Sequence, residues 1–313
     1  IAIDKKNFGL SFGANISFNK NKIKSLGSLK TMSNDLTQSY WASSEIGQDY
    51  WIEVGGSVGK MYGYVSDGRY EVSDFERYDE VTETWILRDG VSSSSAVGTA
   101  RPGMMKLKDL DNSGDANGSD DKRVIGDANP LHTGGFNINA RLYGFDLTAN
   151  FNWSYGNDIY NANKIEYTST SKYLYRNLTS DMAGGKRWNN VDAAGNLVTN
   201  MAQLAEMNQN TTMWSPYTDK YIFSDWAVED GSFLRLNTLT LGYTMPTTLV
   251  KKVGINNLRF YVTAYNVFCL TSYSGYDPEV STSRRNGSNL TPGVDYSAYP
   301  KSRQFVVGLN LNF

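Results

Sequence analysis

The sequence of 313 residues carries a net charge of −2, one cysteine and one histidine. This charge argues against a nucleic-acid partner, and a single cysteine, Cys269, cannot form an intrachain disulfide. The single histidine, His132, supports neither a zinc site nor a Ser/His/Asp triad. We therefore predict no enzymatic activity. Mean hydropathy is −0.45, and no stretch approaches the ~18 apolar residues of a membrane helix. Hydropathy does not detect membrane-spanning strands, because half of the side chains of such a strand face water.

Six segments alternate between apolar residues and polar or small ones. In the first, the even-numbered residues from Phe8 to Phe18 are apolar, and the odd-numbered residues between them are glycine, serine and asparagine. Successive side chains of a strand point to opposite faces, so each segment has one apolar and one polar face. The pattern predicts strands at 8–18, 135–142, 145–155, 234–245, 258–268 and 303–313.

The last predicted strand ends on an aromatic residue, and its apolar side chains all share one parity. This C-terminus resembles the recognition signal that the assembly machinery of bacterial outer-membrane barrels reads. We therefore predict a membrane-assembly signal made of Phe305, Val307, Leu309, Leu311 and Phe313.

Most of these strands have close to the ~9–11 residues needed to cross a bilayer at a tilt. The predicted fold class is all-β: a transmembrane antiparallel barrel, with its apolar face in lipid and its polar face on the lumen. The alternative is a half-buried antiparallel β-sandwich. Six strands are too few to close a bacterial barrel, which needs an even number from ~8 upward, and an open edge in lipid leaves backbone groups unpaired. We therefore expect the C-terminal portion of a larger barrel, whose N-terminal strands and signal peptide are absent from these residues.

The connections between the strands differ greatly in length. Periplasmic turns of such barrels are short, which fits Tyr143-Gly144 and the link 246–257. Extracellular loops are then expected at 19–134, 156–233 and 269–302. The run Ser57–Val65 also has an extended pattern, and we interpret it as an extracellular hairpin or cap, because one more span would break the up-and-down order.

Two of these loops are rich in aromatic residues. Their rings could stack on sugars or pack against a protein partner, and ordinary packing within the loops explains them equally well. They are Tyr160, Tyr167, Trp188, Trp214 and Tyr217 in the second loop, and Tyr273, Tyr276, Tyr296 and Tyr299 in the third.

An acidic stretch in the first long loop matches a calcium-binding pattern. In an EF-hand-type loop, oxygens at positions 1, 3, 5, 7, 9 and 12 surround Ca²⁺, and glycine at position 6 permits the sharp turn. Gly114 takes that sixth position here. The possible Ca²⁺ ligands are Asp109, Asp111, Ser113, Asp115 through its backbone carbonyl, and Asp120 or Asp121. The twelfth residue is Asp rather than Glu, no flanking helices are evident, and an Asp/Asn/Gly turn cluster without metal is the alternative.

The segment Asp230–Pro246, DGSFLRLNTLTLGYTMP, resembles the signature that precedes the penultimate hairpin of SusC/RagA-type TonB-dependent outer-membrane transporters. Further stretches agree with that family in order along the chain. They are Asn19–Gly27, Gly55–Gly68, Lys108–Pro130, Leu142–Phe151, Tyr265–Val280 and Tyr299–Phe313.

The resemblance implies a ~22-stranded barrel with an N-terminal plug, located in the bacterial outer membrane and crossing it many times. It implies import of oligosaccharides, or of oligopeptides as in the RagA branch. The implied partners are a SusD-like surface lipoprotein, TonB, the barrel assembly machinery and outer-membrane lipid. Plug and TonB box lie outside these residues, and no cofactor is implied beyond the possible Ca²⁺. The competing hypothesis is a soluble or surface-displayed β-sandwich that binds glycans without transporting them.

Overall fold

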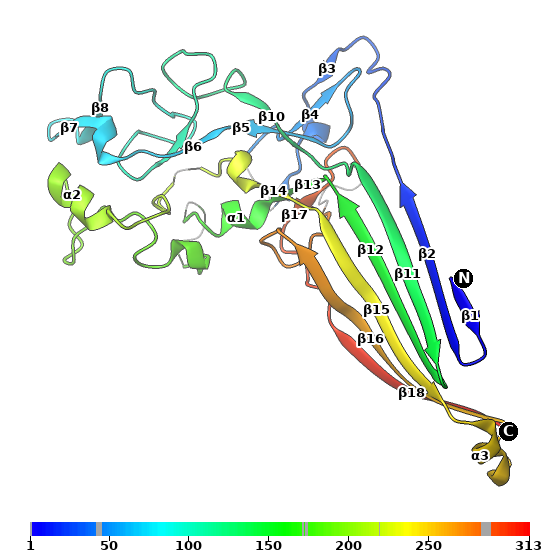
Figure 1. Ribbon diagram of the computed structural model, residues 1–313. Helices are drawn as coiled ribbons and strands as arrows, with labels where there is room; N and C mark the ends of the chain where they lie inside the picture. Colours follow the sequence, from blue (N-terminus) through cyan, green and yellow to red (C-terminus); the bar gives the residue numbers. More distant parts are fainter. Residues whose placement is uncertain (1, 42–45, 171, 173–174, 219, 283–288) are drawn as a thin grey trace.

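The computed structural model describes residues 2–41, 46–170, 172, 175–218, 220–282 and 289–313. One long, curved antiparallel sheet carries a body of loops and short elements at one end (Figure 1). This loop body consists of the described parts of segments 18–131, 156–232 and 272–303. Its strands follow the order β1-β2-β11-β12-β15-β16-β18. Their bounds are β1 Ile3–Lys5, β2 Phe8–Ser17, β11 His132–Leu142, β12 Phe145–Tyr155, β15 Phe233–Thr244, β16 Asn257–Thr271 and β18 Gln304–Asn312.

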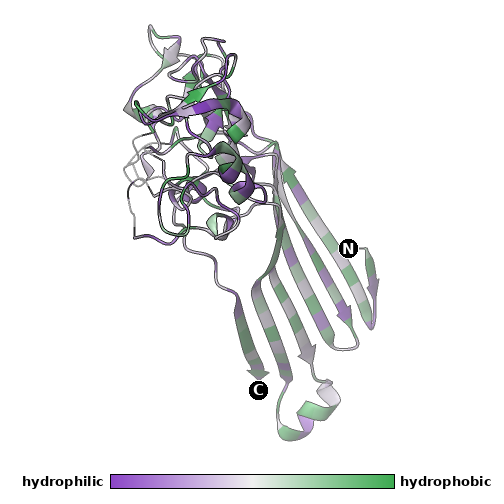
Figure 2. Ribbon diagram, turned by 90° about the vertical axis from the view of Figure 1, so that its left-hand side faces the viewer, coloured by the Kyte–Doolittle hydropathy of each residue, from purple (hydrophilic) through white to green (hydrophobic). Residues whose placement is uncertain are grey.

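The hydrogen-bond register brings the apolar sets of the strands onto one continuous face. One row of paired residues crosses six strands: Phe12, Ile138, Ala149, Leu239, Ala264 and Phe305. The neighbouring row belongs to the opposite face and is mostly polar: Ser11, Asn139, Thr148, Thr240, Thr263 and Val306. The resulting bands of alternating hydropathy run along the strands in Figure 2. A slip of one residue in any strand would move its apolar side chains to the other face, so the alternation restricts the register to pairings of like side chains.

A bulge preserves this arrangement where the alternation in β15 changes parity. Asn237 has no partner between Leu236 and Thr238, and on β16 the pairing skips Asn266 and Val267. The extra residue in β15 lets the apolar side chains on both sides of the bulge, Leu236 and Leu239, point to the same face.

The loop body contains several small sheets. They are β10-β5-β4-β3, β14-β13-β17, β6-β9 and β7-β8. The strand bounds are β3 Thr31–Met32, β4 Tyr50–Glu53, β5 Lys60–Tyr64, β6 Ser66–Arg69, β7 Phe75–Asp79, β8 Thr84–Leu87, β9 Met105–Leu107, β10 Lys122–Asp127, β13 Asp158–Asn161, β14 Val228–Asp230 and β17 Val294–Asp295.

Helices are short, and the largest buried side chains belong to the loop body. The helices are α1 Ala162–Glu166 and α2 Met201–Asn208 in the loop body, and α3 Thr247–Val250 at the far end of the sheet. The fully buried large residues of the described chain include Trp41, Tyr50, Tyr70, Phe75 and Tyr160. Among the described residues, no helix is both long enough and apolar enough to cross a membrane.

Six strands of the long sheet lie on the six alternating segments, within a few residues at each end. The sheet also has a seventh strand, the short β1, which pairs with β2; its three residues are too few to show an alternation, and sequence analysis did not predict it. The run Ser57–Val65 contains β5, which belongs to the loop body and not to the long sheet. At the turn Tyr143-Gly144 both residues have positive φ, 46° and 90°, as a two-residue hairpin turn requires.

Candidate functional site

The apolar face of the long sheet is open. Phe12, Phe305 and Val307 are 59%, 70% and 79% exposed, and in the described part of the chain no second sheet pairs or packs with this face. A β-sandwich would bury these side chains in its core. An apolar surface that extends across six strands indicates contact with an apolar environment.

Aromatic residues gather where this face meets the loop body. The rings of His132 and Tyr155 stack with centroids 5.1 Å apart, and Phe18 lies edge-on to His132 at 5.8 Å. Trp153 Nε1 donates to His132 Nδ1 at 3.0 Å. The Trp153 ring lies over Gly134, and a Cβ atom added to Gly134 would come within 2.3 Å of this ring. Amphipathic rings in this position match the interfacial girdle of membrane barrels.

The opposite face carries amides, hydroxyls and paired charges. Arg259 donates from Nε to Asp146 Oδ1 at 2.9 Å, and this pair passes over Gly242 of the strand between them. Thr240 and Thr263 hydroxyls are 2.9 Å apart. We call this face of the sheet the inner face and the apolar one the outer face.

A buried arginine anchors the loop between β16 and β18 to the inner face. Arg235 of β15 is 2% exposed. Its Nη2 donates to Asp277 Oδ1 at 2.6 Å, and its Nε lies 2.8 Å from Glu279 Oε2. The remaining nitrogen, Nη1, donates to Asn266 at the β16 bulge. Lys301, on the returning part of the loop, pairs with Glu279 at 2.6 Å. Two cations therefore balance two carboxylates, and both ends of the loop are held.

Sequence analysis did not identify this network. Its signal was present: Arg235 is a charged residue inside an alternating segment, and Asp277 and Glu279 flank a proline in the following loop. The sequence alone does not reveal that the loop folds back onto the strand that carries the arginine, because Arg235 and Asp277 lie 42 residues apart.

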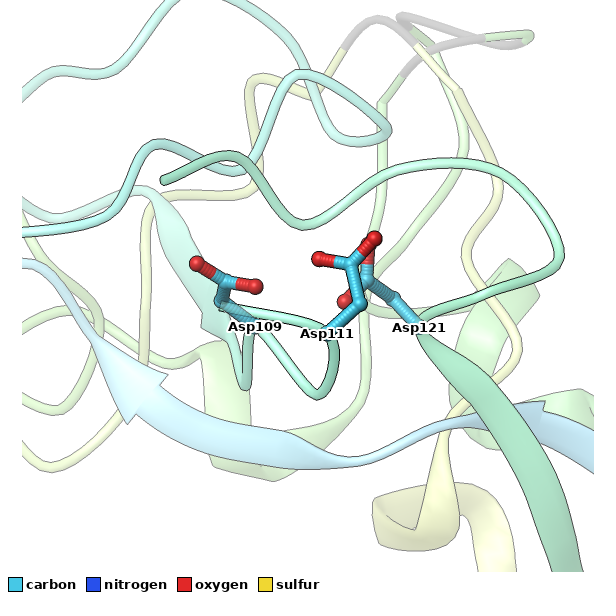
Figure 3. Close-up of side chains that lie close together, drawn as sticks. All are labelled: Asp109, Asp111 and Asp121. Atoms are coloured by element: carbon cyan, nitrogen blue, oxygen red, sulfur yellow. The ribbon is translucent and has the colours of Figure 1, made fainter. Parts of the chain in front are cut away.

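The acidic loop brings together three of its predicted ligands. Ligand atoms of Asp109, Asp111 and Asp121 lie within 4.8 Å of one another, and Figure 3 shows Asp109 and Asp111 on one turn and Asp121 beside them, where the chain enters β10. Backbone N–H groups already donate to all three: Gly114 to Asp109, Ser113 to Asp111, and Leu110 and Asn117 to Asp121. These bonds are the ones expected of a turn cluster without metal. The same three carboxylates are also oxygen ligands of the kind that Ca²⁺ prefers, so the arrangement is compatible with both interpretations.

The other predicted ligands lie outside that group. Ser113 Oγ donates to the backbone oxygen of Asp115 at 3.2 Å, and Asp120 is not among the converging carboxylates. The Asp115 carboxylate turns toward Ser93 and Ser95. Burial alone would raise its pKa, but hydrogen bonds from Ser93, Ser95 and Asn117 outweigh it and lower the pKa of Asp115 to about 2.

The aromatic residues of the long loops divide into three groups, of which Tyr167 and Tyr296 form the half-buried one. Tyr160, Trp188, Trp214 and Tyr273 are buried, which is the ordinary packing alternative. Tyr273, for example, donates its hydroxyl to the buried Asp295 at 2.6 Å. Tyr217, Tyr276 and Tyr299 are largely exposed on the loop surface.

The predicted assembly residues lie together on the outer face at one edge of the sheet. Val307, Leu309 and Leu311 pair with Val262, Phe260 and Leu258 of β16. Phe313 follows directly after β18 and is 77% exposed. In the described chain β18 has one neighbour in the sheet, and β1 forms the opposite edge.

Comparison with known proteins places these features in a family context. No family model matches the sequence. The chain is 30% identical over 313 residues to the TonB-dependent receptor P3 of Formosa agariphila, an alignment that covers 99% of this chain and 27% of that relative. It is 31% identical over 149 residues to the TonB-dependent receptor SusC of Bacteroides thetaiotaomicron, covering 46% of this chain and 13% of SusC. The chain thus spans about a quarter of the length of the first of these relatives.

Solved structures show the same fold. The RagAB peptide importer in its 'closed-closed' state matches 99% of this chain with a TM-score of 0.65 and 20% identity, over 28% of that chain. The 'open-open' state matches with a TM-score of 0.62. Together with the receptors named above, these likenesses confirm the resemblance seen in the sequence: the chain matches the SusC/RagA-like TonB-dependent transporters over nearly its whole length.

Proposed function

We propose that this chain forms part of the barrel wall of a TonB-dependent transporter that imports nutrient oligomers across the bacterial outer membrane. The observation that supports it most directly is the single-layered sheet, with an exposed apolar outer face and a polar inner face. Lipid would cover the outer face, and the inner face would line an aqueous lumen. The relatives are named as receptors and importers, which supports transport rather than catalysis.

The loop body then lies on the cell surface. It occupies one end of the sheet, whereas the opposite end carries short connections: the turn between β1 and β2, the tight turn at Tyr143-Gly144 and the link with the short helix α3. Loops of this length usually carry function. The likeness to SusC and to RagAB supports docking of a SusD-like surface lipoprotein on the loop body. TonB would act through a plug-bearing part of the protein beyond these residues.

The assembly signal belongs to the same proposal. Phe305, Val307, Leu309, Leu311 and Phe313 lie on the lipid-facing side of an edge strand, where the barrel assembly machinery could read them while β18 pairs with a strand from the rest of the barrel. Closure of the barrel satisfies the backbone groups of that edge. Deletion of Phe313 from the complete protein should lower its amount in the outer-membrane fraction, and an unchanged amount would contradict this role.

Transport is tested in the bacterium that produces the complete protein. Uptake of the growth-supporting oligomer should require both this gene and TonB, and the detergent-solubilised protein should co-purify with a surface lipoprotein. Uptake that continues at the same rate without TonB would reject energised import, and a preparation free of lipoprotein would reject the proposed role of the loop body.

A further inference from the structure

A hollow of about 680 Å³ lies where β2 leaves the long sheet and the chain enters the loop body (Figure 1). Its lining comes from three stretches that lie far apart in the sequence. They are residues 18–22 after β2, residues 55–60, and residues 127–131 between β10 and β11. The hollow therefore lies at the level where the apolar outer face ends and the loop body begins.

Hydrogen bonds between these stretches hold the wall of the hollow in shape. The Asn21 side chain accepts from the backbone N–H of Val58 at 2.8 Å and donates to Asn129 Oδ1 at 3.0 Å, so one amide group joins all three stretches. The Ile23 N–H donates to the Gly56 carbonyl at 2.9 Å. Because none of these contacts uses a lysine, the shape of the hollow does not depend on the charged side chains that line it.

The lining carries a positive net charge. It contains the three lysines Lys20, Lys22 and Lys60 and one carboxylate, that of Asp127. Lys60 pairs with Glu53 at 3.1 Å. Lys20 and Lys22 are exposed, and neither forms an ion pair with any residue that the structure describes. Two ammonium groups are thus available to an anion at the mouth of the hollow.

Apolar side chains border the hollow on the side of the sheet. Phe18 and Leu131 belong to its lining and are 71% and 65% exposed. The Phe18 ring lies edge-on to His132 in the aromatic group described above. From Phe18 the apolar set of β2 continues along the outer face through Ile16 and Phe12, which are also exposed. Positive charge and apolar surface therefore adjoin each other here.

A lipid that carries a phosphate group matches both parts of this surface. Clusters of lysines beside a membrane-spanning segment attract anionic headgroups, and lysine stems can lie on apolar surface while their ammonium groups stay in water. Acyl chains would cover the apolar side chains below the hollow. A soluble anion would contact the lysines alone and leave Phe18 and Leu131 uncovered.

We propose that this hollow binds the phosphate group of an outer-leaflet lipid, whose acyl chains lie along β2 on the outer face. The site rests on the membrane orientation of the function proposed above, and it concerns the lipid around the barrel rather than the cargo. A lipid bound here would tie the base of the loop body to the surface of the membrane.

Lipid binding is measured on the complete protein, purified in detergent and stripped of lipid. The probes are lipid A with its phosphate groups, lipid A from which a phosphatase has removed them, and inorganic phosphate alone. The test variant is Lys20→Gln with Lys22→Gln. The control is Lys251→Gln with Lys252→Gln, which removes two lysines that are also exposed, beside α3 at the opposite end of the sheet. Heat-dependent migration on gels confirms that all three proteins are folded.

Phosphorylated lipid A should bind, and the test variant should bind it about 30-fold more weakly, as expected for the loss of two lysine contacts with an anionic headgroup. The control variant should bind it as the unaltered protein does. An unaffected test variant, an equal loss in the control, or equal binding of the dephosphorylated lipid would each overturn the proposal. Displacement of the lipid by inorganic phosphate at equal concentration would assign the lysines to a soluble anion and would overturn it as well.

This measurement is independent of transport, because it needs neither TonB nor cargo. Lost uptake with intact lipid binding would reject the proposed function and leave the lipid site standing. Normal uptake together with an unaffected test variant would reject the lipid site alone. Loss of the co-purifying surface lipoprotein from the test variant, with lipid binding unchanged, would assign Lys20 and Lys22 to that protein and overturn the lipid site.

Discussion

Arg259 and Asp146 form an ion pair across an intervening strand. They belong to β16 and β12, and between them β15 carries Gly242, where a Cβ atom would lie 2.4 Å from Arg259 Nη2 and 2.6 Å from both Asp146 carboxylate oxygens. The absence of a side chain at this position lets the two long side chains lie flat along the inner face.

Replacing Gly242 with valine should therefore separate this pair. We expect the complete protein to assemble less efficiently and to unfold at a lower temperature, because both charges lose their partner on a partly buried face. The measurement is the temperature at which the folded band disappears on gels. Gly184→Val is the control, since a Cβ atom at Gly184 would have no heavy atom of the described chain within 4 Å. Equal effects of the two substitutions would contradict the interpretation.

Removal of Arg235 should release the loop between β16 and β18. Arg235→Met leaves Asp277 buried without its cation, and breaking a buried ion pair in this way costs about 3–5 kcal/mol. Limited proteolysis should then cut near residues 277–281 much faster than in the unaltered protein. Lys301→Met removes only the more exposed partner of Glu279 and should change the cleavage rate little, as exposed pairs contribute about 0–1 kcal/mol. Similar cleavage of both variants would refute the anchoring role.

The stability of the loop body should depend on pH through Asp49. Its carboxyl group is fully buried; burial raises its pKa to about 7, although hydrogen bonds from Ser39 act in the opposite direction. The folded state therefore favours the protonated form. This contribution to stability is complete below the ordinary value of 3.8 and is lost as pH rises through about 7.

We accordingly expect hydrogen-exchange protection of residues 46–53 to fall between pH 5 and pH 8 after correction for intrinsic rates. The fall should be roughly tenfold or more, since each pKa unit corresponds to about 1.4 kcal/mol. Asp49→Asn should abolish the dependence, and Asp67→Asn, an exposed carboxylate, should retain it. A dependence that survives in Asp49→Asn would assign it to another group.

Calcium binding at the acidic loop remains a prediction, and the structure narrows its ligands to Asp109, Asp111 and Asp121. We expect millimolar Ca²⁺ to slow proteolysis between residues 109 and 121, because the ion would offset the mutual repulsion of three carboxylates. Asp111→Asn should remove this effect, whereas Asp120→Asn, outside the group, should keep it. Identical cleavage with calcium and with chelator would establish the metal-free turn cluster instead.

The alternating segments were sufficient to predict six strands and the two faces of the sheet, because a period of two depends only on neighbouring residues. Face alignment then requires Phe12 to pair with an even-numbered residue of 135–142, and the structure selects Ile138. The Arg235 network could not be predicted in this way. It depends on a long loop returning to the sheet, and loop paths are not encoded in a local pattern.

Two adjacent residues of β18 allow the most direct test of the faces. Val307 lies on the outer face and Val306 on the inner face, and the two are 79% and 43% exposed. In water alone, lysine at either position would be tolerated, and more readily at the more exposed Val307. If lipid covers the outer face, a lysine at that position costs about 2–4 kcal/mol near the middle of the bilayer. We therefore expect Val307→Lys to reduce the folded protein in the outer membrane strongly and Val306→Lys to reduce it little. The reverse order would show that water, not lipid, surrounds the apolar face.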